Sequence, residues 1–168
     1  MKKIAFIIGI FVFTTALYAQ NLKFGHISSD MLLSAMPEYD SAQAKVDNLR
    51  QQYDLEIERI QVEINKKIDE FSKNERTMSD LIKEAKASEI QEMQVRLQNF
   101  AQTAQQDLQR QSMAFLQPVM EKARKAIEEV AKDQGIIYVF DMSQGNPIYA
   151  SDKSIELLPM VLTKMGLQ

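Results

Sequence analysis

Few side chains in this chain of 168 residues could do covalent chemistry. It holds one histidine, His26, and no cysteine, so a cysteine–histidine pair is impossible. A serine–histidine–aspartate triad would depend on that single histidine, which lies in a predicted strand, and no nucleophile-elbow motif is present. The five glycines form no phosphate-binding loop. The sequence therefore predicts a protein that is not an enzyme and that has no catalytic, cofactor or metal site.

The carboxylates are numerous, but they alternate with lysines, a pattern that is typical of solvated helix faces. An apolar repeat that steps three, four and four residues runs through the middle of the chain twice. Its period of eleven residues corresponds to about 3.67 residues per turn, so each apolar stripe stays on one side of a nearly straight helix. The first stripe comprises Val46, Leu49, Tyr53, Ile57, Ile60, Ile64, Ile68 and Phe71. The second comprises Ile90, Met93, Leu97, Ala101, Ala104, Leu108, Ser112, Phe115, Val119, Ala123, Ala126 and Val130.

Two such helices predict one long antiparallel hairpin over residues 39–134, packed along the two stripes. At about 1.5 Å per residue, arms of some 40 residues would be roughly 60 Å long. The reversal is expected between 72 and 88, where polar sequence interrupts the repeat and either Ser79 or Ser88 could cap the returning helix. Pro118 removes a hydrogen bond inside that helix and is expected to bend it.

The remaining segments, 20–38 and 135–168, predict a small β-rich head. Residues 22–27 are expected to form a strand, and a brief helix should follow and end before Pro37. Residues 136–140 predict a second strand, which a turn at 143–146 would join to 147–150 as a β-hairpin, and a closing helix would begin near Ile155. The fold class is therefore α+β and mostly α, a helical hairpin projecting from a small head.

This head is too small to bury a good core by itself, so we expect other copies of the chain to complete it. The apolar strand residues that could form the interface are Phe24, Ile27, Ile137, Val139 and Phe140.

The first nineteen residues have the order of a secretory signal peptide. Lys2 and Lys3 precede fourteen apolar residues and then small residues that end at Ala19. Cleavage after Ala19 would export the rest of the chain, although the apolar segment could instead persist as an uncleaved anchor. Without its two lysines, the exported chain carries 18 basic and 23 acidic side chains, which argues against a nucleic-acid partner.

Some apolar residues of the predicted hairpin lie off the stripes. Leu55, Val62 and Val95 each follow a stripe position by two residues, and Met113 precedes Phe115 by two, which rotates all four by about 200° to the opposite face. Nine glutamines lie between Gln91 and Gln117. These residues are either ordinary exposed side chains or sparse contact points for apolar segments of a bound protein, a use to which methionine is suited.

Three stretches of the sequence resemble the Skp family, also called OmpH-like, of periplasmic chaperones. FGHISSDMLLSAMPEYDSAQ resembles the family's opening strand, short helix and proline, and MSDLIKEAKASEIQEMQVRLQNFAQTAQQDLQ resembles its returning arm. LQPVMEKARKAIEEVAKDQGIIYVFDMSQGNPIYAS resembles the return of the chain into the head. The resemblance implies a homotrimer whose arms enclose a cavity for unfolded outer-membrane proteins.

Two features depart from that family. Its best-known members are strongly basic, whereas this chain is mildly acidic and has six basic against six acidic side chains around the predicted tip, which argues against lipopolysaccharide binding. The cap of the closing helix is also altered, reading Glu156, Leu157, Leu158, Pro159. The leading hypothesis is an ATP-independent holdase that prevents aggregation of its clients. The alternative is a structural spacer or adaptor of the cell envelope whose hairpins dock onto other hairpins.

Overall fold

The structure is a computed structural model that describes residues 22–143, 145 and 147–167. The predicted signal peptide, residues 1–19, lies outside these residues. The chain divides into two compact units. We call Leu33–Arg124 the hairpin unit, and we call the residues up to Leu32 and from Lys125 onward the sheet unit. Within the described residues, the helices lack a stretch of the length and apolarity needed to cross a membrane.

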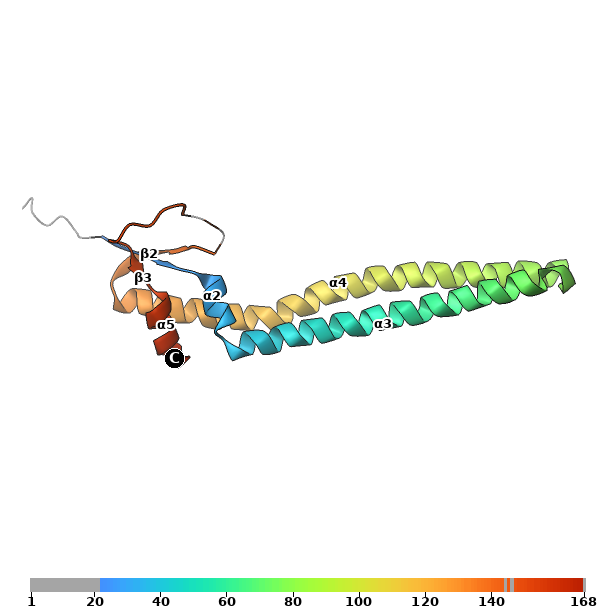
Figure 1. The fold of residues 1–168 in the computed structure, drawn as a ribbon, viewed down its shortest axis with the longest axis horizontal. Helices are drawn as coiled ribbons and strands as arrows, with labels where there is room; N and C mark the ends of the chain where they lie inside the picture. The colour runs from blue at the N-terminus through green and yellow to red at the C-terminus, as the bar shows by residue number, and fades with distance from the viewer. Residues whose placement is uncertain (1–21, 144, 146, 168) are drawn as a thin grey trace, which may run out of the picture. The chain divides into compact units, whose positions relative to one another are not determined.

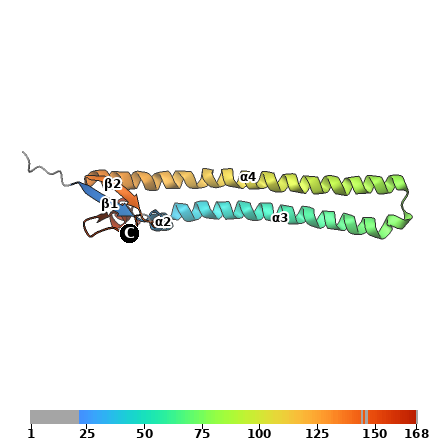
Figure 2. The same ribbon diagram turned by 90° about the horizontal axis from the view of Figure 1, so that it is seen from above.

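The hairpin unit consists of two long helices and the short turn between them. Helix α3 spans Pro37–Asn74, the 3₁₀ turn η2 spans Glu75–Thr77, and α4 spans Asp80–Asp133, with its last nine residues in the sheet unit. Pro37 suits the first turn of α3, and Glu38 and Asp40 there favour the positive end of the helix dipole. The two helices lie side by side in both views (Figures 1 and 2). The predicted long helical hairpin is therefore confirmed.

Cross-helix contacts establish that α3 and α4 are antiparallel. The Lys122 ammonium pairs with the Glu38 carboxylate near one end, and Lys67 Nζ lies 2.5 Å from Glu89 Oε1 near the other. In the seam, Ile60, Ile64 and Met93 form a buried cluster against which Ile68, Leu97 and Phe100 pack. Every member of both apolar stripes is buried or half-buried, as the eleven-residue repeat predicts. Helix α4 continues through Pro118 without interruption.

The sheet unit has three strands, and its topology differs from the predicted one. Strand β1 (Lys23–Ile27) lies between β2 (Ile136–Asp141) and β3 (Ile155–Glu156), and both pairings are parallel. The predicted β-hairpin is wrong, because residues 147–150 form no strand. The chain instead passes to the other side of β1, where Ile155 and Glu156 pair with Gly25 and His26 as β3.

Two further helices belong wholly or partly to this unit. Helix α2 (Ser29–Ser34) follows β1, and α5 (Leu158–Met165) closes the chain. The closing helix begins three residues later than predicted, because Ile155 and Glu156 form β3 and the Leu157 amide donates to the His26 carbonyl at 2.9 Å. Leu32, Leu157 and Val161 are fully buried.

Gly25 lies at the centre of the sheet, where there is no room for a side chain. A Cβ atom there would collide with Leu157 Cδ1 and would lie 3.2 Å from Ile136 Cδ1 and 3.3 Å from the Ile155 carbonyl oxygen. An added side chain at this position would therefore force Leu157 to move away from β1.

We expect Gly25→Ala to destabilise the sheet unit by about 1 to 3 kcal/mol, because the added methyl group must displace a fully buried leucine. Urea unfolding followed by circular dichroism would measure this loss. An unchanged midpoint would mean that Leu157 moves aside freely.

Asp141, at the end of β2, holds the start of α2 through several hydrogen bonds. Its Oδ1 accepts from the Ser29 amide at 3.1 Å and from the Ser143 amide at 2.9 Å. The Ser143 hydroxyl also donates to Oδ1, and the Ser29 hydroxyl donates to Oδ2. Burial alone would raise the pKa of this carboxyl, but the hydrogen bonds from Ser29 and Ser143 outweigh burial and lower the pKa to about 2 from 3.8. The ionised form therefore stabilises the fold.

The direction of this pKa shift predicts a pH dependence. Because the folded pKa lies below the unfolded one, the contribution is present above about pH 4 and is lost as pH falls toward 2. Asp141 is exposed, so solvent screening reduces its contribution to about 1 kcal/mol. Asp141→Asn should cost that amount at pH 7, and the difference from wild type should disappear near pH 2 in urea titrations. A difference independent of pH would assign the effect to geometry and not to charge.

Candidate functional site

The single histidine has a structural contact in the sheet unit. His26 Nδ1 lies 2.9 Å from Ser154 Oγ, which connects β1 to the segment before β3. Among the described residues, histidine and carboxylate side chains do not gather in a group of three or more that could hold a metal ion. Exposed apolar side chains are the candidate functional features, and they occur in both units.

The four off-stripe residues of the hairpin all have exposed side chains. Leu55 and Val62 on α3 are 57% and 60% exposed, and Val95 and Met113 on α4 are 46% and 59% exposed. The structure thus places two candidates on each helix, on surfaces that the seam leaves free. Their exposure makes contact with another molecule possible, but the environment of the two pairs differs.

The α4 pair belongs to a continuous uncharged surface, which we call the outer row. Because 18 residues make five full helical turns, Val95 and Met113 lie on the same side of α4. The positions between and beyond them on that side carry amide or apolar side chains, and all are exposed. The outer row comprises Val95, Asn99, Gln102, Gln106, Gln109, Met113, Gln117 and Met120.

This row spans about 38 Å of helix at 1.5 Å per residue. Met120, 56% exposed, was missed in the sequence analysis, although its spacing of seven residues from Met113 places it on the same face. On α3, by contrast, charged side chains surround the apolar pair. Arg59, between Leu55 and Val62, pairs with Glu56 at 2.6 Å.

Polar contacts also cross the seam. Tyr53 Oη donates to Asp107 Oδ2 at 2.5 Å, and the Arg110 guanidinium pairs with the same carboxylate. The hydrogen bond from Tyr53 lowers the pKa of Asp107, and the same bond raises the pKa of Tyr53. The ring of Tyr53 also meets Phe100 edge to face at 6.2 Å. The contacts of Tyr53 with Asp107 and Phe100 thus join α3 to α4.

The sheet unit exposes an aromatic face. Phe24 stacks on Tyr138 with ring centroids 6.4 Å apart, and it contacts Phe140 at 6.5 Å. These three side chains, which we call the aromatic face, are 41%, 64% and 45% exposed. Because β2 is an edge strand, the aromatic face lies next to a row of unpaired backbone groups.

Only some of the five predicted interface residues lie on exposed surface. Phe24, Phe140 and Ile137 are exposed, the last at 47%. Ile27 is 2% exposed, and Val139 is half-buried and pairs in register with Gly25, so their own protomer covers them. Tyr138 was missed in the sequence analysis, although its alternation with Phe140 along the strand places the two on one face.

Comparisons with known proteins agree with this architecture. A model of the family described as outer membrane protein (OmpH-like) matches residues 23–165. The crystal structure of an OmpH-like protein from Caulobacter crescentus CB15, described as a candidate outer membrane chaperone, is similar with a TM-score of 0.73. That match covers 90% of each chain at 15% identity, which shows a shared fold. A search of curated proteins finds no match.

Proposed function

The chain belongs to the OmpH-like outer membrane protein family, and from this membership we propose that it is a holdase chaperone for unfolded outer-membrane proteins. The family is periplasmic and non-enzymatic. The signal peptide proposed for residues 1–19 would export the chain to that compartment. Binding and release in this proposal need no nucleotide, since affinity arises from many weak contacts.

The outer row of α4 is the observation that carries this proposal. Its apolar side chains are separated by amides that can both donate and accept hydrogen bonds, and charged groups are absent from the row. An unfolded chain offers scattered apolar side chains and free backbone polar groups, which this alternation complements. Several weak contacts made at the same time hold such a chain. Because each contact can break by itself, release requires no energy source.

The direct test is suppression of aggregation. A urea-denatured β-barrel protein is diluted into buffer with increasing amounts of the exported chain, and light scattering is recorded. We expect scattering to fall to baseline near stoichiometric amounts of the assembled protein. Unchanged scattering would contradict the holdase proposal and leave the spacer or adaptor as the better hypothesis.

A matched pair of variants tests the outer row. Val95→Gln with Met113→Gln should weaken client retention about threefold to tenfold, because two apolar contacts are lost while glutamine preserves the helix. The control makes the same change at Leu55 and Val62 on α3, where charged neighbours surround the apolar side chains, and should have a smaller effect. Fluorescence titration with a labelled unfolded client measures both. Equal affinities in wild type and the α4 variant would assign Val95 and Met113 to ordinary surface.

We further propose that the aromatic face joins copies of the chain into a trimer. The support is the exposure of three neighbouring aromatic rings beside an edge strand, since an exposed apolar patch often marks an interaction site. A closed assembly covers both the rings and the strand edge. The number of copies follows from the family resemblance.

A further inference from the structure

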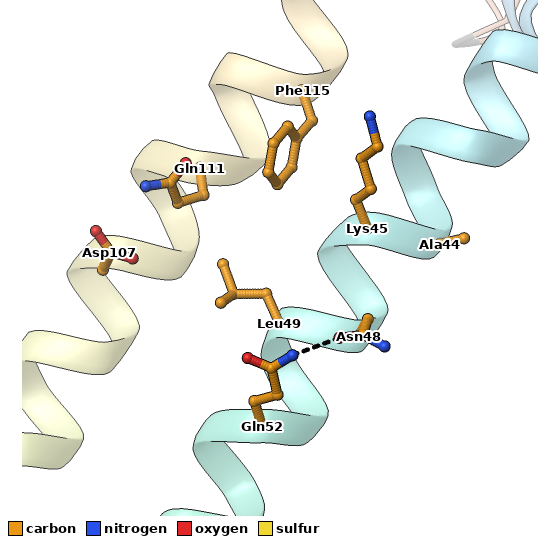
Figure 3. A pocket seen from close by; sticks show the side chains of 8 residues that line it. All are labelled: Ala44, Lys45, Asn48, Leu49, Gln52, Asp107, Gln111 and Phe115. Atoms are coloured by element: carbon orange, nitrogen blue, oxygen red, sulfur yellow. Dashed lines mark hydrogen bonds between the residues drawn. The ribbon is translucent and has the colours of Figure 1, made fainter.

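The seam between α3 and α4 contains a hollow of about 460 Å³ beside residues 44–52, in the first half of α3. Its walls come from both helices, and Figure 3 shows Leu49 and Phe115 extending into the gap between them. The lining residues are Ala44, Lys45, Asn48, Leu49, Gln52, Asp107, Gln111 and Phe115. The hollow is broadly open to solvent, with Leu49 and Phe115 on its floor, and its volume lies in the range of binding pockets.

Small and polar side chains border the hollow. Ala44, Asn48 and Gln52 line it from α3, and Gln111 lines it from α4. Farther along the hairpin, by contrast, Ile60, Ile64 and Met93 fill the space between the helices. Leu49 and Phe115 consequently remain only half-buried and offer an apolar floor.

The charges around this floor are unequal. Lys45 Nζ lies over the Phe115 ring at 5.7 Å from its centroid, and among the described residues no carboxylate is within ion-pair distance of it. Asp107, on the opposite wall, already accepts hydrogen bonds from Tyr53 and Arg110. The hollow therefore presents an available cation at one end, while the anion at the other end is already engaged.

We propose that this hollow binds an extended peptide segment in which an acidic residue and an aromatic residue are separated by one position. Lys45 and Leu49 are one helical turn apart, about 6 Å along the axis. In an extended chain, side chains two residues apart point to the same side and lie roughly 6.6 Å apart. An acidic side chain can thus meet Lys45 while the aromatic side chain of the same segment covers Leu49.

The polar walls suit the backbone of such a segment. Gln52 Nε2 donates to Asn48 Oδ1 at 2.6 Å, as drawn in Figure 3, and each amide retains further donors or acceptors. Gln111 supplies a third amide from α4. The Asp107 carboxylate repels an acidic side chain of the peptide at its end of the hollow. The peptide therefore binds with its acidic residue at the Lys45 end. This proposal rests on the proposed holdase function, for which it names the sequence pattern that the hairpin prefers.

Peptide binding to the full exported chain tests the proposal. The probes are fluorescein-labelled, glycine- and serine-rich peptides with an Asp-Gly-Phe core, with an Asn-Gly-Phe core, or with Asp and Phe adjacent, and fluorescence anisotropy gives the affinities. We expect the first peptide to bind about threefold to fivefold more tightly than the other two. Equal affinity for all three, or no binding, would overturn the proposal.

Variants connect the preference to the hollow. Lys45→Gln should remove the difference between the Asp and Asn peptides, whereas Lys66→Gln, the same change at an exposed lysine on α3, should preserve it. Ala44→Trp should weaken binding of every peptide by occupying the floor. A preference retained in Lys45→Gln would overturn the assignment. Aggregation suppression is measured in parallel. If the chain suppresses aggregation but lacks the peptide preference, only this inference is refuted. If the chain does not suppress aggregation, the proposed function is refuted.

Discussion

Ile64→Ala is expected to lower the free energy of unfolding of the hairpin unit by about 3 kcal/mol. Ile64 is 1% exposed and lies in the cluster with Ile60 and Met93, where α3 and α4 pack on each other. Truncation removes apolar contact and leaves a cavity that two rigid helices cannot easily close. Because successive groups of seam residues stabilise a long hairpin, the loss of local stability should be greatest near Ile60, Ile64 and Met93.

Urea unfolding monitored by circular dichroism measures the total loss, and hydrogen exchange locates it. Amides of residues near 60–64 and 93–97 should exchange faster, while those of the sheet unit stay protected. The control is Val62→Ala, two residues away and 60% exposed, which should change stability by less than about 0.5 kcal/mol. Similar losses in the two variants would contradict the seam assignment.

Phe140→Asp should dissociate the proposed trimer. Phe140 belongs to the aromatic face and is 45% exposed in the protomer, so the substitution removes apolar contact without opening a buried core. Symmetry repeats every change in each copy, and several carboxylates would meet in one interface. We expect association to weaken at least about a hundredfold, equivalent to roughly 2.8 kcal/mol.

Sedimentation velocity at micromolar concentration measures this effect. Wild type should sediment as a trimer and Phe140→Asp as a monomer that retains its helical circular dichroism signal. Met31→Asp, on α2 and 60% exposed, changes an equally apolar surface residue outside the aromatic face and should leave the trimer intact. A wild-type monomer would refute the assembly, and a trimeric Phe140→Asp would place the interface elsewhere.

The predicted β-hairpin in the sheet unit was wrong because the pairing of strands depends on residues far apart in the chain. Residues 136–140 carry the β-branched and aromatic side chains of a strand, and that prediction was correct. Their partner is β1, more than 100 residues away, and the pairing is parallel. Strand propensity does not identify the partner strand, so local sequence predicted pairing with the nearby residues 147–150. The tight packing at Gly25 and the burial of Ile27 were missed for the same reason.

The helical hairpin was predictable from sequence because its information is periodic and local. Each apolar position in the eleven-residue repeat follows the last by about one turn, so the seam and the exposed side follow from helix geometry alone. The hollow beside Lys45 and the aromatic face depend on distances between segments far apart in the chain. Only the folded structure decides these, because side-chain packing, and not periodicity, determines how closely such segments approach.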